Sequence, residues 1–425
     1  MTEIRNNDLG EVYYEIKHRT GLTILVYPKA GYSTTYAVFG TNYGSIDTFI
    51  KTEKEQKQIP EGTAHYLEHK LFESEELDAF QLFARTGASA NAYTSFDKTC
   101  YLFSCSSNFS ENLKYLLDFV QKPYFTEETV RKEQGIIGQE IQMYKDEPGW
   151  QVLFNLLKCL YHDHPVRIDI AGTVESISHI TADLLYDCYN SFYNPSNMVL
   201  AVAGNTTVDE VLAVADEALL PKECFEVSRA QLDEPDETVS NYIAEKFAVT
   251  IPTFAFGYKE HCDRPLCTLK EKILADIILE YIAGETSPLY NRLLCEGLVS
   301  AGFGGEYFAG YGYRAVIFDG QSSDPDRVAE EIKKEIAGIR ENGFDENELD
   351  RIRKMNYGRC VMGYNNIDGL ANELVSSHFE NYHLFDELDI YRNITVEDVA
   401  RRFEGMFVDG REALSVILPF NVDEV

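Results

Sequence analysis

Two histidines and a glutamate in the segment EGTAHYLEHKLFE (61–73) have the spacing of a metal site on a helix. His65 and His69 are four residues apart, so on a helix they share one face, about 6 Å apart along the axis, and can bind one ion. Glu68 directly precedes His69, which turns its carboxylate toward the same side. The nine histidines of the chain are otherwise scattered, so this pairing stands out.

The three side chains have the chemistry of a hydrolytic zinc site. Imidazole is a preferred zinc ligand, and a catalytic zinc takes three protein ligands and a water molecule. Glu68 could accept a proton from the water that the metal activates. A solvated helix face with incidental histidines is the alternative. The glutamate favours zinc, because H-x-x-E-H is the inverzincin signature.

A third ligand must come from elsewhere, and TVRKEQGIIGQEIQMYKDE (129–147) offers carboxylates. Glu133 and Glu140 are two helical turns apart and lie on nearly the same face. A carboxylate beside a buried face is costly unless it binds a cation. Spacing alone does not choose between these two and Glu147, and a solvated face is the alternative for all three. The apolar stripe expected to hold this helix against the domain consists of Ile136, Ile137 and Ile141.

The elements that must position these residues are mixed strands and helices. Alternating or β-branched runs predict strands, and apolar residues at helical spacing predict helices. Thr126 fits the N-cap of the helix that carries Glu133 and Glu140, and Pro148 lies just past its end. Without a strict βαβ alternation the fold class is α+β. Strands are predicted at 12–18, 22–28, 34–44 and within 88–106, and helices at 61–72, 76–86, 110–120 and 127–144.

The chain contains an internal repeat. Residues 180–204 align without gaps on 394–418, and in each copy a threonine precedes a helix, a turn and an apolar strand. The offset of 214 is close to half of the 425 residues, which favours duplication. We therefore expect a zinc-bearing domain in 1–228, a polar linker in 229–242 and a homologous domain in 243–425.

The same offset predicts that the second domain keeps the helix without the zinc site. It places apolar residues opposite the polar trio: Leu279 opposite His65, Ile282 opposite Glu68 and Ala283 opposite His69.

Composition narrows the class of partner. The net charge of −32 argues against nucleic acid and against a membrane surface, which both require clustered basic residues. A cationic peptide would be attracted to such a field, although a solvated acidic surface is the simpler explanation of the charge. Nine dispersed cysteines without a CxxC pair, no signal peptide and no apolar run of about 20 residues predict a reduced, cytoplasmic location without a membrane span.

Four motifs in order resemble the pitrilysin and insulinase family of zinc peptidases, and most closely its short bacterial, processing-peptidase-like subunits. The motifs are HYLEH, GASANAYTSFDKTCYLF, VRKEQGIIGQEIQMYKDEP and YHDHPVRIDIAGTVESI. The resemblance implies two similar α+β domains, each a mainly antiparallel sheet packed with helices, as in mitochondrial processing peptidase. It also implies one Zn²⁺ per chain, with His65, His69 and Glu140 as ligands, Glu68 as general base and Glu133 as the carboxylate that orients a ligand histidine.

The strand in ASANAYTS is expected to bind substrate. In the family the matching strand is a sheet edge that pairs with the peptide backbone near the scissile bond, which points to Ala90, Asn91 and Ala92 here. Strand addition gives affinity with little sequence demand. Without the resemblance, the segment is an ordinary core strand.

One departure from the family concerns the substrate clamp. Many members carry an Arg and a Tyr seven residues apart in the non-catalytic domain, where this chain has LYNRLLCEGLVSAGF (289–303). Leu293 and Leu294 stand where the Arg would be, and Ser300 where the Tyr would be. The expected partner is a zinc-less paralogous subunit that carries the clamp, in a heterodimer. The alternative is a homodimer in which Arg292 and Arg314 substitute.

The expected function is a zinc endopeptidase that cleaves unstructured peptides, or processes a small precursor, inside a closed chamber. The alternative is a non-catalytic assembly or chaperone-like subunit that has kept the fold. The full set of His65, Glu68, His69 and Glu140 favours the enzyme. A further histidine pair, His162 and His164 in YHDHP, is interpreted as a loop that enters the extended residue before a proline rather than as a metal site.

Overall fold

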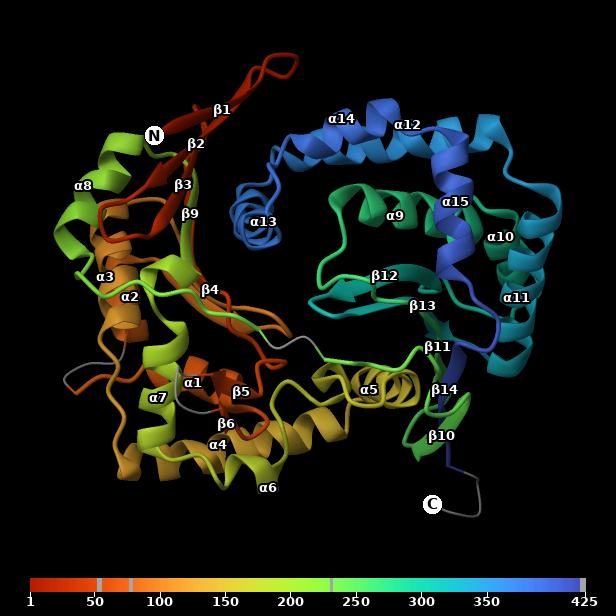
Figure 1. Cartoon of the computed structure of the whole chain (residues 1–425), viewed down its shortest axis with the longest axis horizontal. Helices are drawn as coiled ribbons and strands as arrows, with labels where there is room; N and C mark the ends of the chain where they lie inside the picture. The colour runs from red at the N-terminus through yellow and green to blue at the C-terminus, as the bar shows by residue number, and fades with distance from the viewer. Residues whose placement is uncertain (52–55, 76–78, 230–231, 421–425) are drawn as a thin grey trace. The chain divides into compact units, whose positions relative to one another are not determined.

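The computed structural model of the chain describes residues 1–51, 56–75, 79–229 and 232–420, which form two compact units (Figure 1). Unit 1 comprises Met1–Ile141, Asp169–Ala230 and Val361–Asp386. Unit 2 comprises Gln142–Ile168, Gln231–Cys360 and Glu387–Val425. The predicted division of the chain into 1–228, a linker at 229–242 and 243–425 stays a prediction. Residues 230, 231 and 421–425 lie outside the described residues.

Unit 1 is built on a mixed, mainly antiparallel sheet whose described strands have the order β1-β2-β3-β9-β4-β8-β7. Only the β3–β9 pair in this sheet is parallel among the described residues. The predicted alternating segments supply its central strands, whose inward side chains are apolar and buried. The strands are β1 (Thr2–Asn6), β2 (Glu11–Lys17), β3 (Thr23–Pro28), β4 (Thr35–Thr41), β7 (Ser89–Thr94), β8 (Thr99–Cys105) and β9 (Met198–Gly204), with a separate hairpin of β5 (Phe49–Lys51) and β6 (Gln56–Gln58).

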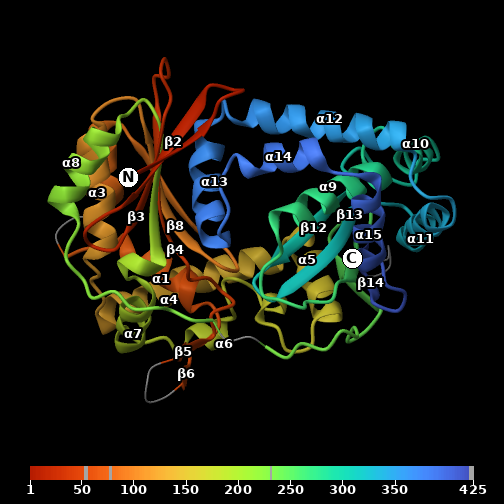
Figure 2. The same ribbon diagram turned by 45° about the horizontal axis from the view of Figure 1, so that its top comes forward.

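Helices cover both faces of this sheet. α3 and α8 lie on one face, and α13 lies on the other, against β4 and β9 (Figures 1 and 2). The helices are α1 (Thr63–Leu71), α2 (Ala79–Thr86), α3 (Phe109–Gln121), α4 (Glu127–Lys145), α6 (Val174–Ile177), α7 (Ala182–Phe192), α8 (Val208–Ala218) and α13 (Ile367–Glu380). The helix predicted at 76–86 corresponds to α2, and residues 76–78 lie outside the described residues.

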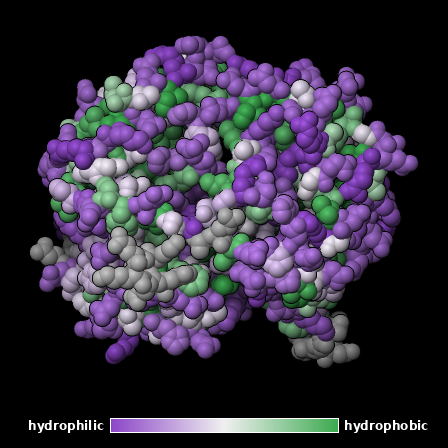
Figure 3. All heavy atoms as spheres, viewed as in Figure 1, coloured by the Kyte–Doolittle hydropathy of each residue, from purple (hydrophilic) through white to green (hydrophobic). Residues whose placement is uncertain are grey.

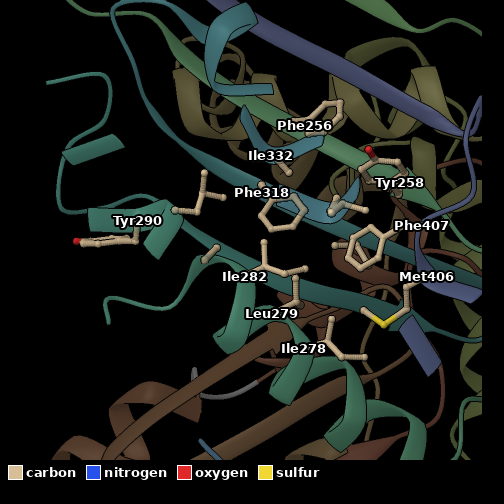
Figure 4. Close-up of a cluster of buried hydrophobic side chains, with 14 of the residues drawn as sticks. Phe256, Tyr258, Ile278, Leu279, Ile282, Tyr290, Phe318, Ile332, Met406 and Phe407 are labelled. Atoms are coloured by element: carbon tan, nitrogen blue, oxygen red, sulfur yellow. The ribbon is translucent and has the colours of Figure 1, made fainter. Parts of the chain in front are cut away.

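Unit 2 has a sheet of order β10-β14-β11-β13-β12, in which β10 and β14 are parallel. Phe256, Tyr258 and Phe318 point from this sheet into a core shared with Ile278 and Ile282 of α9 (Figure 4). The strands are β10 (Tyr242–Phe247), β11 (Thr253–Lys259), β12 (Gly304–Gly310), β13 (Tyr313–Gln321) and β14 (Glu412–Pro419). The helices are α5 (Pro148–Leu160), α9 (Leu269–Ala283), α10 (Pro288–Cys295), α11 (Pro325–Asn342), α12 (Glu346–Gly363), α14 (Asp386–Asn393) and α15 (Val396–Met406).

The two units share one topology, as the repeat predicts. If the strands β3, β4, β7, β8 and β9 are numbered in chain order, their spatial order is 1-5-2-4-3, and β10 to β14 have the same order. Helices α7 and α15 begin at 182 and 396 and end at 192 and 406, so both ends differ by the offset of 214. Thr181 and Thr395 each cap their helix through the side chain.

Each unit borrows one helix from the other half of the chain. α13 comes from the second half and packs in unit 1, and α5 comes from the first half and packs against β11 and β14 in unit 2. Glycines allow the close approach, because a Cβ on Gly40 of β4 would lie 2.9 Å from Val375 of α13. A Cβ on Gly257 of β11 would lie 3.0 Å from Leu156 of α5. Each borrowed helix is therefore part of the core that it covers.

The visible surface is mostly polar (Figure 3), and the cysteines are free thiols. The face in Figure 3 is mostly hydrophilic, with hydrophobic residues in small separate areas. All nine cysteines are free thiols, and five of them are buried. Among the described residues, no helix combines the length and apolar character needed to cross a membrane.

The YHDHP loop has a structural role in unit 2, and His164 has the extended backbone expected before a proline. Val166 donates its backbone N–H to Nδ1 of His164, and Nε2 lies 3.0 Å from the carbonyl oxygen of Tyr311. Because Nδ1 accepts, the proton belongs on Nε2. The carboxylate of Glu234, in the predicted linker, accepts the backbone N–H groups of residues 162, 163 and 164, each at 2.8 Å.

Neutral His164 should make folding depend on pH. Burial lowers its pKa to about 4, although Glu234 opposes the shift. As the pH falls below about 6.5 the unfolded chain takes up this proton first, so stability is full above that pH and falls as the pH approaches 4, by roughly 3 kcal/mol. Urea unfolding across this range should show a smaller pH dependence for His164→Gln than for the wild type. Parallel curves for the two proteins would assign the pH dependence to other groups.

Candidate metal centre

Helix α1 carries both histidines of the HxxEH motif and is fixed at its start by a glycine. Gly62 has a φ of 84°, in the left-handed region that favours glycine, and a Cβ there would lie 2.3 Å from the carbonyl oxygen of Ala171. Ser176 donates from its hydroxyl to the carbonyl of Glu61 at 2.9 Å. A side chain at position 62 would therefore displace the helix that positions the histidines.

Helix α4 supplies the carboxylates and packs directly on α1. The hydroxyl of Tyr66, a fully buried residue of α1, donates to the carbonyl of Val130 in α4. Ile137 and Ile141 are buried as predicted. The prediction was wrong for Ile136, which is 48% exposed, because it lies about 100° around the helix from Ile137.

The structure brings His65, His69 and Glu140 together. One ligand atom from each lies within 4.8 Å of the others, and this is the only such group of three or more found in the described part of the chain. Nε2 of His65 is 3.7 Å from Oε1 of Glu140, and Nε2 of His69 is 3.5 Å from Oε2 of the same carboxylate. The group combines two imidazoles from α1 with one carboxylate from α4. Glu147, the third carboxylate that spacing left open, precedes α5 and is not in this group.

The two imidazoles have different electrostatic environments. Burial, followed by the neighbouring His69, lowers the pKa of His65 to about 3, so His65 is neutral and keeps a lone pair for a metal. Burial would also lower the pKa of His69. Its hydrogen bond to Glu133 and the nearby carboxylates outweigh that effect, and the pKa of His69 is raised.

Glu133 contacts the outer nitrogen of His69. Its Oε1 lies 3.0 Å from Nδ1 of His69, and its side chain is only 12% exposed. A carboxylate on Nδ1 holds the proton there and leaves the Nε2 lone pair directed at Glu140. Glu133 thus contacts the outer nitrogen of a candidate ligand and is not a member of the three-residue group.

Glu68 lies beside the group and is 8% exposed. Burial raises the pKa of this carboxyl group, and a hydrogen bond from Thr94 partly opposes the rise. The hydroxyl of Thr94 lies 2.6 Å from Oε2 of Glu68. Sequence reasoning did not single out Thr94. The available signal was the alternation in ASANAYTS, which puts Thr94 on one face of a strand with the small residues Ala90 and Ala92.

These residues fit a zinc ion. Two imidazoles and a carboxylate form a donor set that catalytic zinc sites use, with a fourth position for water. The inner nitrogens point at the same carboxylate, and the outer nitrogen of His69 has the carboxylate partner typical of a ligand histidine.

The predicted substrate strand is a sheet edge. β7, which contains Ala90, Asn91 and Ala92, pairs with β8 and is the last strand in the sheet order. Asn91 uses its side-chain oxygen to accept the backbone N–H of Ala92 at 2.9 Å. A peptide that pairs with Ala92 must therefore displace the Asn91 side chain.

The second unit has no polar trio at the corresponding positions. Leu279, Ile282 and Ala283 lie on α9 and are buried in the core of unit 2, as the offset predicts.

The stretch expected to carry a clamp holds apolar and small side chains. Leu293 is fully buried, whereas Leu294 and Ser300 are exposed. Arg314 is 3% exposed and donates to the carbonyls of Arg264 and Leu266, at 3.0 and 3.3 Å. Its guanidinium group is therefore used in contacts inside unit 2.

Arg292 is more accessible and pairs with Glu331 and Glu335. Of the two arginines proposed as a substitute clamp, Arg292 has the more exposed side chain.

Two family models match the chain. The model described as "Insulinase (Peptidase family M16)" matches residues 53–174, which include the HxxEH helix and both glutamates. The model described as "Peptidase M16 inactive domain" matches residues 179–356.

Known proteins similar to the chain include an uncharacterized zinc protease of Bacillus subtilis, YmfH. It is 40% identical over 98% of this chain and 99% of its own length. A crystal structure described as an M16-like peptidase from Alicyclobacillus acidocaldarius is 37% identical, with a TM-score of 0.93 over 96% of this chain and 98% of that chain. Pitrilysin shares the fold at 16% identity, with a TM-score of 0.76 over 99% of this chain and 45% of that chain.

Proposed function

The chain belongs to the pitrilysin and insulinase family (peptidase family M16), and on that premise we propose that it is a zinc-dependent endopeptidase for unstructured peptides. The observation that carries the proposal is the meeting of His65, His69 and Glu140 beside a buried Glu68. In this proposal the three residues bind one zinc ion, Glu133 orients His69, and Glu68 is the general base. Relatives named zinc proteases support the choice of metal.

The roles of the side chains follow from their positions. A bound zinc ion supplies a Lewis acid that polarises a peptide carbonyl and activates water. Glu68 takes a proton from the attacking water and can return it to the leaving amine. Its buried position keeps the carboxylate from being fully solvated, which strengthens it as a base.

The edge strand β7 supports the proposed substrate class. Ala90, Asn91 and Ala92 bind the backbone of an extended peptide, so the substrate must present an unpaired strand. The small side chains of Ala90 and Ala92 leave room for many different side chains of the peptide substrate. The net charge of −32 favours cationic peptides through long-range attraction.

The alternative is a non-catalytic subunit that keeps the fold. A scaffold does not need a buried carboxylate next to two imidazoles, whose burial is costly. The deciding experiment measures zinc in the purified chain and cleavage of a fluorogenic unstructured peptide, before and after chelation. Zinc near one per chain with chelator-sensitive cleavage supports the enzyme. Metal-free protein that binds peptide without cleaving it supports the scaffold.

We further propose that the enzyme works as a heterodimer with a zinc-less paralogue that supplies the clamp. The support is the apolar Leu293 at the position expected for the clamp Arg, and Ser300 at that expected for the Tyr. A peptide held only by β7 is poorly positioned, and an error of about 1 Å can cost about 100-fold in rate. A homodimer that uses Arg292 is the alternative.

Addition of the paralogue should raise peptide cleavage at least about tenfold without changing zinc content, because the clamp corrects position and not the metal site. In the homodimer alternative, the single chain is fully active and Arg292→Ala slows it. Arg327→Ala is the matched control, since Arg327 is an exposed arginine of the same unit paired with Glu296. Full activity of the single chain, unchanged by Arg292→Ala, would contradict both versions of the clamp.

A further inference from the structure

The hydroxyl of Thr94 has a single hydrogen, and the surrounding contacts determine where it goes. Thr99, opposite Thr94 at the end of the β7–β8 ladder, donates its own hydrogen to the carbonyl of Tyr43 at 2.9 Å. The two threonine hydroxyls are 3.4 Å apart, whereas Thr94 lies 2.6 Å from a carboxylate oxygen of Glu68. A charged acceptor at the shorter distance is much the stronger. Thr94 therefore donates to Oε2 of Glu68.

The hairpin that carries Thr94 is tightly anchored. Its turn, 95–98, accepts backbone N–H groups from Ser45 and Ile46 at 3.1 and 2.9 Å. Gly44 packs so closely that a Cβ there would lie 2.4 Å from the carbonyl oxygen of Phe96. The end of β7 thus has little freedom to move relative to the 44–46 segment.

A buried ion pair strengthens this anchor. Arg229 donates to both carboxylate oxygens of Asp47, at 2.8 and 2.9 Å, and also to the carbonyl of Asp97 in the turn. Asp47 in turn accepts the backbone N–H of Gly44 at 2.8 Å. The side chains of Arg229 and Asp47 are 11% and 5% exposed. Arg229, the first residue of the predicted linker, therefore holds the hairpin from which Thr94 reaches Glu68.

We propose that Thr94 is a positioning residue that fixes the Glu68 carboxylate, an inference that rests on the proposed role of Glu68 as general base. By donating to Oε2, the hydroxyl selects one rotation of the Glu68 carboxylate and leaves Oε1 free to accept a proton from the attacking water. The strand that would bind the peptide backbone also holds the base, so both are placed by one rigid element.

The test compares Thr94→Val, which keeps the shape without the hydroxyl, with Thr94→Ser, which keeps the hydroxyl. We expect Thr94→Val to lower kcat about 100-fold, as for a misplacement of about 1 Å, with KM and zinc content little changed. Crystal structures should show the Glu68 carboxylate in more than one orientation in Thr94→Val only. Thr94→Ser should stay within about threefold of the wild type.

The matched control is Thr99→Val, which removes the neighbouring hydroxyl without touching Glu68. Wild-type turnover in Thr94→Val would overturn the inference, as would an equal loss of kcat in Thr99→Val, which would assign the effect to hairpin stability. If Glu68→Gln is inactive while Thr94→Val is active, only the role of Thr94 fails. If Glu68→Gln retains wild-type turnover, the proposed function fails with it.

Discussion

Replacing Glu68 by Gln should abolish most peptide cleavage while leaving zinc and the fold in place. The amide has the shape of the carboxylate and can still accept the hydrogen of Thr94 through its oxygen, but it cannot take a proton from water. Loss of a general base typically costs about 10²- to 10⁴-fold in rate. Zinc content, thermal unfolding and kcat of the purified variant measure the three parts of this expectation.

Glu61→Gln is a suitable control, because it makes the same chemical change at the start of the α1 segment while the carbonyl of residue 61 keeps its bond to Ser176. It should cleave peptide at the wild-type rate. Because strand addition at β7 does not involve the base, Glu68→Gln should still bind unstructured peptide with the wild-type Kd. Turnover by Glu68→Gln at the wild-type rate would mean that another group is the base.

Removal of any candidate zinc ligand should abolish tight zinc binding. His65→Ala and His69→Ala each leave only two protein ligands, which cannot hold a catalytic zinc tightly. Glu140→Gln should have nearly the same effect, because a neutral amide is a poor replacement for an anionic ligand. Zinc affinity, measured by competition with a chromogenic chelator, checks all three variants.

Glu133→Gln is the informative comparison, since Glu133 and Glu140 lie on the same helix and differ in what they contact. Loss of a carboxylate that only orients a ligand histidine typically costs about 10- to 100-fold in metal affinity. Glu140→Gln should therefore cost far more than Glu133→Gln. The reverse order would mean that the roles of the two carboxylates are exchanged, and undiminished zinc in either histidine variant would remove the proposed site.

Spacing along the chain was sufficient for much of the candidate site. The period of the helix puts His65 and His69 on one face, and the same period aligns Glu133 with Glu140. Periodicity could not tell which carboxylate faces the histidines, because that depends on how α4 is rotated on α1. The burial of Ile137 and Ile141 defines that rotation. Ile136 was predicted to face the domain but is exposed, so a rotation inferred from all three isoleucines would have been wrong.

The contacts that sequence reasoning missed join segments far apart in the chain. The hydrogen bond from Thr94 to Glu68 connects a strand to a helix, and neither periodicity nor motif spacing carries that information. The same holds for Arg229, whose polar surroundings in the sequence predict a linker although its side chain is buried against Asp47. Both contacts depend on tertiary packing, which local patterns do not encode.

The reciprocal borrowing of α5 and α13 gives the chain the architecture of a domain-swapped dimer fused into one polypeptide. α5 follows α4 as α13 follows α12, so the exchanged pieces are equivalent elements of the two repeats. A cut in the predicted linker would therefore not separate the two units. The first fragment would contain α5, which packs in unit 2, and the second would contain α13, which packs in unit 1. Neither fragment would hold a complete core.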